Sequence, residues 1–226
     1  MMMHARGEPD YYNPSYTSAG TGDWDIMSGG SWFGNPPGTN PLGANPATRV
    51  FQGWVTPKVV TSDLRNVKLA PREIMPMKNY DVTKVDPNII LVPVEWTDST
   101  APADVYGLPK DPKNGKYITQ GWYIEYVSRS VNAPPLHPDM DRSPYFDRYA
   151  YATGVLVWHF DYYKKSNVYY GSNNGQTDAN RSQMDVEEFD FLDNTQELQL
   201  NYTRGEPSDP FFGTATGMTN PGPKKI

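Results

Sequence analysis

The sequence contains no cysteine, which excludes disulfide bonds, thiolate metal ligands and a cysteine nucleophile. It also has no apolar run of about 18 residues, the length at which a membrane-spanning helix is expected. Basic residues are outnumbered, because 20 Lys and Arg face 26 Asp and Glu and give a formal charge of -6. Nucleic-acid binding needs a basic surface, so we expect neither a transmembrane segment nor a nucleic-acid partner. No signal-peptide pattern is visible, which says nothing about export if residue 1 is an internal position of a longer protein.

Aromatic and turn-forming residues are abundant. The 226 residues suffice for one large domain or two small ones, and 37% of them are hydrophobic. The 19 Gly and 22 Pro limit long regular helices, while 16 Tyr and 6 Trp supply much of the area available for burial. We therefore expect an α+β fold that is predominantly β and rich in loops.

The order of patterns along the chain predicts a loop-rich first part followed by a β-rich body. Residues 13–48 are rich in Gly, Pro and Asn and predict a long irregular segment. A short helix is expected over 47–54, with Pro46 at its start and Gly53 at its end. Strands are expected in segments rich in Val, Ile, Tyr and Trp, namely 55–61, 88–96, 116–130 and 151–163.

Near the N-terminus, His4, Gly7 and Asp10 have the spacing H-x-x-G-x-x-D. In a zinc site of the pattern H-E-x-x-H-x-x-G-x-x-H/D, a glycine in a left-handed turn ends the helix, so that the third ligand returns to the metal. His4 fits the second histidine of that pattern, Gly7 the turn and Asp10 the third ligand. An exposed histidine followed by an ordinary Pro-Asp turn explains the same residues.

A second pattern follows downstream, where Met27 lies in the tight-turn sequence DWDIMSGGSW. Metzincin proteases have such a Met-turn beneath the zinc, where a buried thioether forms an apolar floor under the histidines. Taken singly, Met27 is better explained as a core methionine in a loop. Found together and in this order, the two patterns indicate a zinc peptidase more strongly than either does alone.

The sequence resembles the M6, or immune inhibitor A-like, metallopeptidases in six short words that occur in the family's order. They are GEPDYY, WDIMSGGSW, QGWVTPK, GVLVWHFD, MDVEEFD and EPSDPFFG. The resemblance implies the C-terminal part of a metzincin-like catalytic domain over residues 1–54, with the Met-turn and a short helix. A β-rich, sandwich-like body over 55–213 and a tail over 214–226 would follow. It also implies a secreted endopeptidase that acts on proteins or peptides and holds zinc through His4 and Asp10.

The pattern departs from the family at its first residue, because Met1 stands where the family has the glutamate of H-E-x-x-H. A zinc-bound water needs such a carboxylate to accept its proton, and the first histidine ligand would precede residue 1. We therefore expect the chain to be a truncated or mis-started segment of the peptidase, inactive as written. The alternative is a non-catalytic β-rich binding protein, for a glycan or a protein ligand, on a degenerate peptidase scaffold.

Acidic residues in the last third of the chain suit a structural calcium ion. Calcium prefers six to eight oxygen ligands from carboxylates, amides and backbone carbonyls, and members of the resembling family bind calcium. The candidate ligands follow an Asn-rich run, and they are Asp178, Asp185, Glu188 and Asp190. A solvated acidic face explains the same residues equally well.

Two histidines and two tryptophans complete the set of candidate residues. His159 lies in an apolar strand and is expected to be a hydrogen-bonded structural residue, while His137 is expected in a loop. If the chain is a glycan-binding protein instead, Trp122 and Trp158 would be the stacking platforms, although strand aromatics are more often part of a core.

Overall fold

The computed structural model describes residues 3–13, 19–33, 36–39, 41–72, 87–100, 107–128, 153–162, 184–187 and 211–214. Short helices form its N-terminal part, namely the 3-10 helices η1 (His4–Arg6), η2 (Gly22–Trp24) and η3 (Gly29–Trp32) and the helix α1 (Pro46–Phe51). The strands are β1 (Lys58–Val59), β2 (Ile89–Thr97), β3 (Tyr117–Val127), β4 (Thr153–Asp161), β5 (Met184–Glu187) and β6 (Phe211–Thr214). Within these described stretches, no helix is long and apolar enough to cross a membrane.

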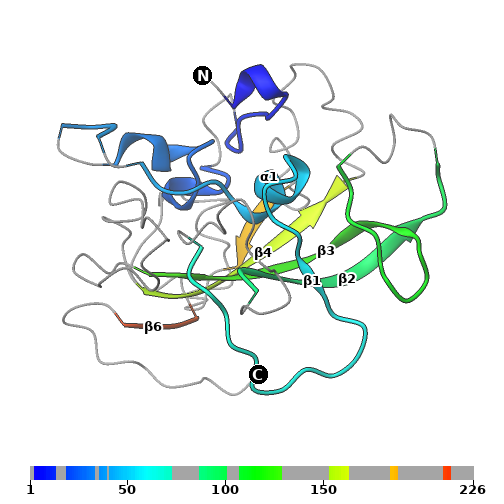
Figure 1. Ribbon diagram of the computed structural model, residues 1–226. Coiled ribbons are helices and arrows are strands. Elements are labelled where there is room, and N and C mark those ends of the chain that lie inside the picture. The colour runs from blue at the N-terminus through cyan, green and yellow to red at the C-terminus, as the bar shows by residue number, and fades with distance from the viewer. Residues whose placement is uncertain are drawn as a thin grey trace.

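The strands form one sheet in the order β1-β2-β3-β4-β5 (Figure 1). The short strand β1 runs parallel to β2, and all the other pairs are antiparallel. β5 and β6 pair with the same strand, β4, at different places: β5 pairs with residues 157–160, and β6 pairs with Thr153 and Val155. The fold is therefore mostly β with a few short helices, as the composition predicts. Because the described residues contain a single sheet, the sandwich-like arrangement stays a prediction.

Alternate residues of the central strands face the interior, as the two-residue period of a pleated strand requires. On β3 and β4, Tyr123 and Trp158 are register partners, and both are fully buried. The adjacent pair Trp122 and His159 faces the other side of the sheet and is only partly buried. The sheet thus has one face that is closed by the rest of the described chain.

The N-terminal segment, residues 3–54, lies over this buried face (Figure 1). Trp24, Met27 and Leu42 belong to the same hydrophobic cluster as Leu91 of β2 and Trp158 of β4. One core therefore spans the predicted boundary at residue 54. We therefore expect the residues before and after this boundary to fold together, although the family resemblance implies that a domain ends there.

A buried ionic cluster joins the same two parts. The carboxylate of Glu125, on β3, accepts hydrogen bonds from Arg49 of α1, from Arg72 Nη1 at 3.0 Å and from Trp158 Nε1 at 3.0 Å. Arg72 Nη1 also donates to the carbonyl of Trp24 at 3.1 Å. Buried carboxylates are tolerated when they are paired and hydrogen-bonded, and in this Glu125 cluster the donors come from three separate segments.

The predicted helix is confirmed over residues 46–51, and its ends follow from the sequence. Pro46 occupies the first turn, and the side chain of Asn45 accepts a hydrogen bond from the backbone N–H of Thr48. Gly53 then takes a left-handed conformation, with φ of 70°. Each of the expected strand segments contains a strand, whereas β5 and β6 lie in segments for which no strand was expected.

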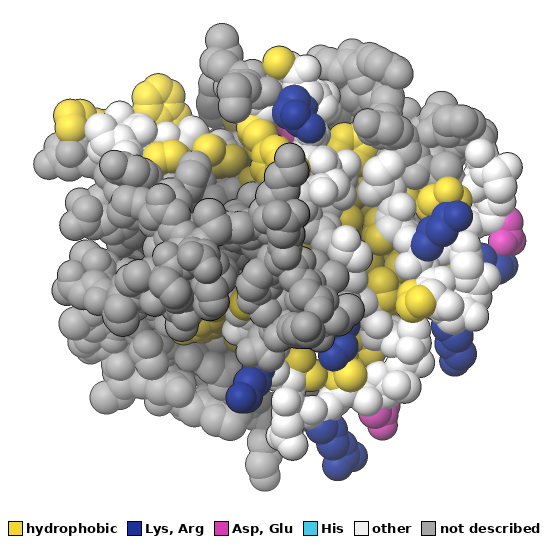
Figure 2. Space-filling model, viewed as in Figure 1, with side chains coloured by type: hydrophobic (Ala, Val, Ile, Leu, Met, Phe, Trp, Pro, Cys, Tyr) yellow, Lys and Arg dark blue, Asp and Glu magenta, His cyan; other side chains and the backbone are white. Residues whose placement is uncertain are grey.

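Figure 2 shows the Lys and Arg side chains of the described residues at separate places on the visible face. The expectation that nucleic acid is not a partner rests on the formal charge of -6 and stays a prediction.

Candidate metal centre

A tight turn brings His4 and Asp10 together. Gly7 ends η1 in the left-handed region, with φ of 88°, and its backbone N–H donates to the carbonyl of His4. After this reversal the carboxylate of Asp10 lies beside the imidazole, with Nε2 of His4 3.1 Å from Oδ1 of Asp10. The structure therefore brings the side chains of His4 and Asp10 together across the Gly7 turn.

The tautomer of His4 follows from its other ring nitrogen. Nδ1 lies 2.9 Å from the backbone carbonyl oxygen of Glu8, and a carbonyl oxygen only accepts hydrogen bonds. Nδ1 therefore carries a hydrogen, and Nε2 is the nitrogen directed at Asp10. A neutral Nε2 and a carboxylate oxygen are both acceptors, so their approach requires a cation between them, either a proton on Nε2 or a metal ion.

The spacing of these two atoms fits a shared metal ion. Zinc binds histidine nitrogen and carboxylate oxygen at about 2.0–2.2 Å in tetrahedral geometry, which separates neighbouring donor atoms by roughly 3.3 Å. The observed separation is 3.1 Å. A second hydrogen bond that fixes the non-ligating nitrogen, like that from His4 Nδ1, is usual for histidine ligands of metals. The described residues hold no group of three or more His, Asp or Glu arranged for a metal, so His4 and Asp10 form a pair of candidate ligands and not a complete set.

Glu8, between the two candidate ligands, was not singled out by the sequence. Its side chain is 3% exposed, and its carboxylate accepts hydrogen bonds from Tyr11, Thr48 and Gln52. No local sequence pattern marks a glutamate in a Gly-x-Pro-Asp turn as buried. Its partners on α1 are 40 and 44 residues away, so only the tertiary structure brings them together.

Met27 lies in a turn formed by residues 25–30, which we call the Met27 turn. Met27 is 5% exposed and belongs to the hydrophobic core. Its backbone carbonyl accepts a hydrogen bond of 3.0 Å from the N–H of Tyr11, the residue that follows Asp10. The Met27 turn is thus tied to the segment that carries the candidate ligands.

A buried carboxylate, Asp25, organises the Met27 turn. Its Oδ1 accepts from the backbone N–H groups of Met27 and Asn45 at 3.2 and 3.1 Å. Its Oδ2 accepts from the side chains of Asn45 and Thr21 at 2.7 and 3.3 Å. Burial raises the pKa of Asp25 to about 6, against the opposing effect of these hydrogen bonds and of the more distant Arg72.

Gly30 closes the Met27 turn for a steric reason. A Cβ atom at this position would lie 2.6 Å from the carbonyl oxygen of Asp23 and 2.7 Å from that of Asp25. Because both atoms belong to the backbone, they cannot move aside as a flexible side chain would. The second glycine of the Gly-Gly pair is therefore required by close packing of the chain on itself.

Of the other candidate His and acidic residues, the structure describes His159 and Asp185, which lie on neighbouring strands of the sheet. His159 is part-buried on the outer face of the sheet, where Nε2 is 2.9 Å from Nε2 of Gln120 and the ring lies 4.7 Å from that of Trp122. Its register partner on β5 is Asp185, which is 5% exposed. The other candidate calcium ligands lie outside the described residues, and they are Asp178, Glu188 and Asp190. His137 lies outside them as well.

Trp158 is not available as a glycan-stacking platform. Its ring is fully buried, and its indole N–H donates to Glu125. Trp122 is partly buried against His159. The glycan-binding alternative therefore loses one of its two proposed aromatic residues.

Comparison with known proteins gives one family match. Residues 2–54 match the model of the immune inhibitor A peptidase M6 catalytic domain. The family expected from the sequence words is thus confirmed over this stretch, which contains His4, Gly7, Asp10 and Met27. The words found after residue 54 lie outside the match, and no curated protein matches the chain.

Proposed function

We propose that residues 3–54 form one side of a zinc-peptidase site in which His4 and Asp10 are metal ligands. The observation that carries this proposal is the 3.1 Å approach of His4 Nε2 to Asp10 Oδ1, with Nδ1 held by the carbonyl of Glu8. The family match over the same residues supports it independently. In this role Gly7 makes the turn between the ligands, and Met27 supplies buried packing as a Met-turn.

Zinc bound at this pair would supply a Lewis acid that polarises a peptide carbonyl and lowers the pKa of a bound water. The chain itself contributes binding and orientation through His4 and Asp10. Position 1 is Met where the family pattern has its glutamate base, and His4 and Asp10 are two ligands of a set that needs a third. We therefore expect the 226 residues alone to bind zinc weakly and not to hydrolyse peptides. By family resemblance, the substrates are proteins or peptides and the location is extracellular.

Zinc titration of the purified chain, followed by calorimetry for all variants and by the NMR signals of the His4 ring where it is present, tests the ligand assignment. We expect zinc to shift these signals. Either His4→Ala or Asp10→Asn should weaken binding by more than the roughly 10–100-fold typical of changes next to a ligand. His159→Gln is the matched control, because His159 lies on the far face of the sheet, and it should bind as the unaltered chain does. Equal binding by His4→Ala would refute the assignment.

A peptidase assay with and without added zinc tests the expected lack of turnover. We expect no cleavage of unstructured protein substrates above background at any zinc concentration, because no carboxylate stands at the base position. Robust cleavage that EDTA abolishes would show that another residue of the chain supplies the base. The zinc titration and the assay are independent, so binding without turnover is the combined result we expect.

A structural calcium ion remains a separate proposal that rests on the acidic and Asn-rich sequence around Asp185. A bound ion that is absent from the unfolded chain raises the melting temperature in proportion to its occupancy. We therefore expect a higher melting temperature in calcium than in chelator, and Asp185→Asn should reduce the difference. Identical melting temperatures in the two conditions would exclude a structural calcium ion.

A further inference from the structure

Glu8 is nearly fully buried, although its neighbours on the turn between His4 and Asp10 are partly or largely exposed. A buried carboxylate is stable only with hydrogen-bond partners, and Glu8 has three. Its Oε2 accepts from the hydroxyls of Tyr11 at 3.2 Å and Thr48 at 3.1 Å. Its Oε1 accepts from Nε2 of Gln52 at 2.7 Å.

Gln52, at the end of α1, holds a second point on the same turn. Its Nε2 also donates to the backbone carbonyl of Arg6 at 3.2 Å, and its Oε1 accepts from Nε of Arg6. Gln52, at the end of α1, therefore holds the turn on both sides of Gly7, at Arg6 and at Glu8. Gly7 itself has open space around it, so these contacts, rather than packing at the glycine, fix the course of the turn.

The backbone of Glu8 faces the candidate ligand. Its N–H donates to the carbonyl of Met3 at 3.2 Å, and its carbonyl accepts the hydrogen on Nδ1 of His4 at 2.9 Å. The residue whose side chain is anchored on α1 is thus the one that selects the His4 tautomer. Glu8 also lies two positions before Asp10, so the position of its backbone constrains the position of the Asp10 carboxylate.

We propose that Glu8 is a positioning residue of the metal site. Its buried carboxylate is hydrogen-bonded to Thr48 and Gln52, and these bonds hold the backbone in the conformation that directs His4 Nε2 and Asp10 at one ion. This inference rests on the proposed metal-binding role of His4 and Asp10. Glu8 itself does not touch the metal, because its carboxylate points into the protein at Tyr11 and α1.

The hydrogen-bond pattern predicts that Glu8 and Gln52 act as a donor–acceptor pair that can be exchanged. In Glu8→Gln, the new amide can still accept from Thr48 and Tyr11 with its oxygen, but its NH₂ group then faces the NH₂ group of Gln52. If Gln52 rotates to relieve this contact, it loses both of its bonds to Arg6. The double variant Glu8→Gln/Gln52→Glu restores an NH₂-to-carboxylate bond at this point, with the direction reversed.

The experiment uses the full chain and measures two properties of each variant. The ring nitrogen shifts of His4 in the metal-free protein, recorded at a pH at which the ring carries a single hydrogen, report the tautomer, and a zinc titration reports the affinity. The variants are Glu8→Gln, Gln52→Glu and the double exchange, with Glu95→Gln as the matched control because Glu95 is exposed on β2. Thr48→Val removes one of the hydroxyl donors to Glu8 at nearly constant volume. It is a milder test that remains usable if the Glu8 and Gln52 variants fail to fold.

We expect Glu8→Gln to lose the preference for hydrogen on Nδ1 and to bind zinc roughly 10–100-fold more weakly, the usual effect of changing a group that orients a ligand. The double exchange should recover most of both properties, and Thr48→Val should shift both in the same direction by less. Wild-type tautomer and affinity in Glu8→Gln, or in Thr48→Val if Glu8→Gln does not fold, would overturn the proposal. The proposal would also be overturned if the double exchange bound zinc no more tightly than the weaker-binding of the two single variants.

Failure of the proposed function gives a different result. If zinc leaves the His4 signals of the unaltered chain unchanged, the metal-binding role of His4 and Asp10 is wrong. The tautomer measurement still decides whether Glu8 positions His4, because it needs no metal.

Discussion

The N-terminal segment and the sheet share one core but are held in shape by different interactions. In the described part of residues 3–54 the longest regular element has six residues, and the buried side chains of Asp25 and Asn45 hold the backbone through hydrogen bonds. The buried carboxylate of Glu8 joins its own turn to α1 through Thr48 and Gln52. In the sheet, strands of up to eleven residues are held by backbone ladders and apolar packing. Substitutions in the first region should therefore change the geometry of the candidate site, and substitutions in the second should change stability.

The buried carboxylates of the two regions show this contrast most directly. Glu125 faces two guanidinium groups, so its charge is balanced by opposite charges. Asp25 is equally buried, yet its carboxylate accepts hydrogen bonds from neutral N–H and O–H donors. Neutral donors orient a carboxylate well but compensate its loss of solvation less completely, which is why burial raises the pKa of Asp25 to about 6.

The largest effect is expected from Glu125→Gln. This change removes the negative charge that two buried arginines share, and breaking a buried ion pair from one side costs about 3–5 kcal/mol. The free energy of unfolding, measured with urea, should fall by about that amount. The glutamine can still accept from Trp158, so the fold itself should survive at low temperature.

Glu95→Gln is the control for this change, since it makes the same substitution at an exposed position of β2. It should alter the unfolding free energy by less than about 0.5 kcal/mol. If the two variants are equally stable, the Glu125 cluster does not join the regions as we describe. A biphasic unfolding curve for Glu125→Gln would show instead that the cluster is what makes the regions unfold together.

The next effect is a pH dependence set by Asp25. Its pKa is raised from 3.8 in the unfolded chain to about 6 in the fold, so the folded protein binds the extra proton more tightly. This contribution to stability is fully present below pH 3.8 and is lost as pH rises through about 6. Two pKa units correspond to about 3 kcal/mol.

Asp25→Asn isolates this contribution because it cannot titrate. The unfolding free energy of the unaltered chain, minus that of Asp25→Asn, should increase as pH falls from about 7 to about 4. Asp63→Asn, at an exposed position, controls for the loss of one carboxylate. A difference that stays constant over this pH range would mean that Asp25 titrates as an ordinary solvated aspartate.

The sequence predicted the regular elements of both regions where local rules decide them. The helix from Pro46 follows from a proline in the first turn and a glycine after the end, and the strands β3 and β4 follow from alternating or continuous apolar residues. The strand β5 was missed because its four residues, MDVE, carry two carboxylates and too few apolar positions to show a period. β6, with the sequence FFGT, also has four residues, which are too few to show a period.

The candidate site was predicted only in part, for a physical reason. His4, Gly7 and Asp10 are close in sequence, so a motif of fixed spacing describes how they meet. Glu8 and Asp25 act through partners that are 20 to 44 residues away, and nothing in their neighbouring residues distinguishes them from solvated carboxylates. The residues that hold the turns in place are therefore visible only once the chain is folded.

A smaller effect is expected from Asn45→Ala, which tests the link between α1 and the Met27 turn. Removing an N-cap side chain costs about 1 kcal/mol, and Asn45 also donates to Asp25 at 2.7 Å. We expect a loss of about 1–2 kcal/mol by urea unfolding. Asn45→Asp is the informative partner: it keeps an N-cap acceptor but places a second carboxylate beside Asp25, and it should be less stable than Asn45→Ala above pH 7.

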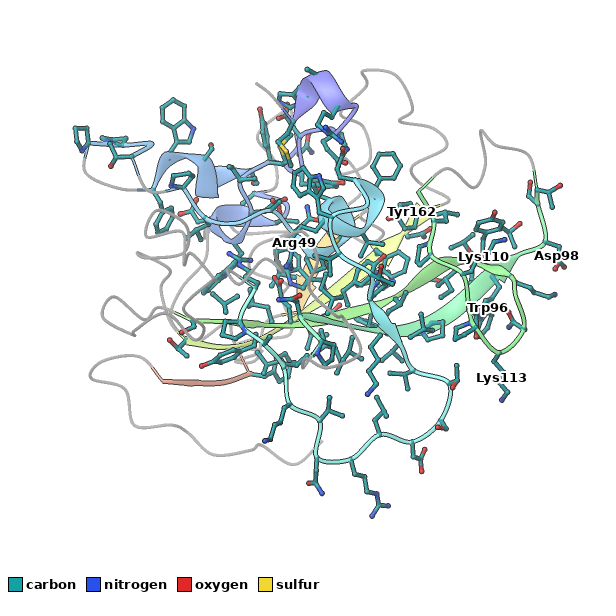
Figure 3. The ribbon with its side chains drawn as sticks, in the orientation of Figure 1. Arg49, Trp96, Asp98, Lys110, Lys113 and Tyr162 are labelled. Carbon is teal, nitrogen blue, oxygen red and sulfur yellow. The ribbon has the colours of Figure 1, made fainter. Side chains whose placement is uncertain are left out.

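The smallest effect is expected at the far end of the sheet, where Asp98 forms an ion pair of 3.0 Å with Lys116. Figure 3 shows Asp98 near Trp96 and Lys110 at the edge of the molecule, whereas Arg49 lies between α1 and the sheet. The two side chains of the pair are 78% and 45% exposed, and exposed ion pairs contribute about 0–1 kcal/mol. Asp98→Asn should lower the unfolding free energy by less than about 0.5 kcal/mol and lose even that in 1 M salt. A loss comparable to that of Glu125→Gln would contradict the contrast between the two regions, because it would place strong electrostatic stabilisation at the solvated edge rather than in the buried contact between them.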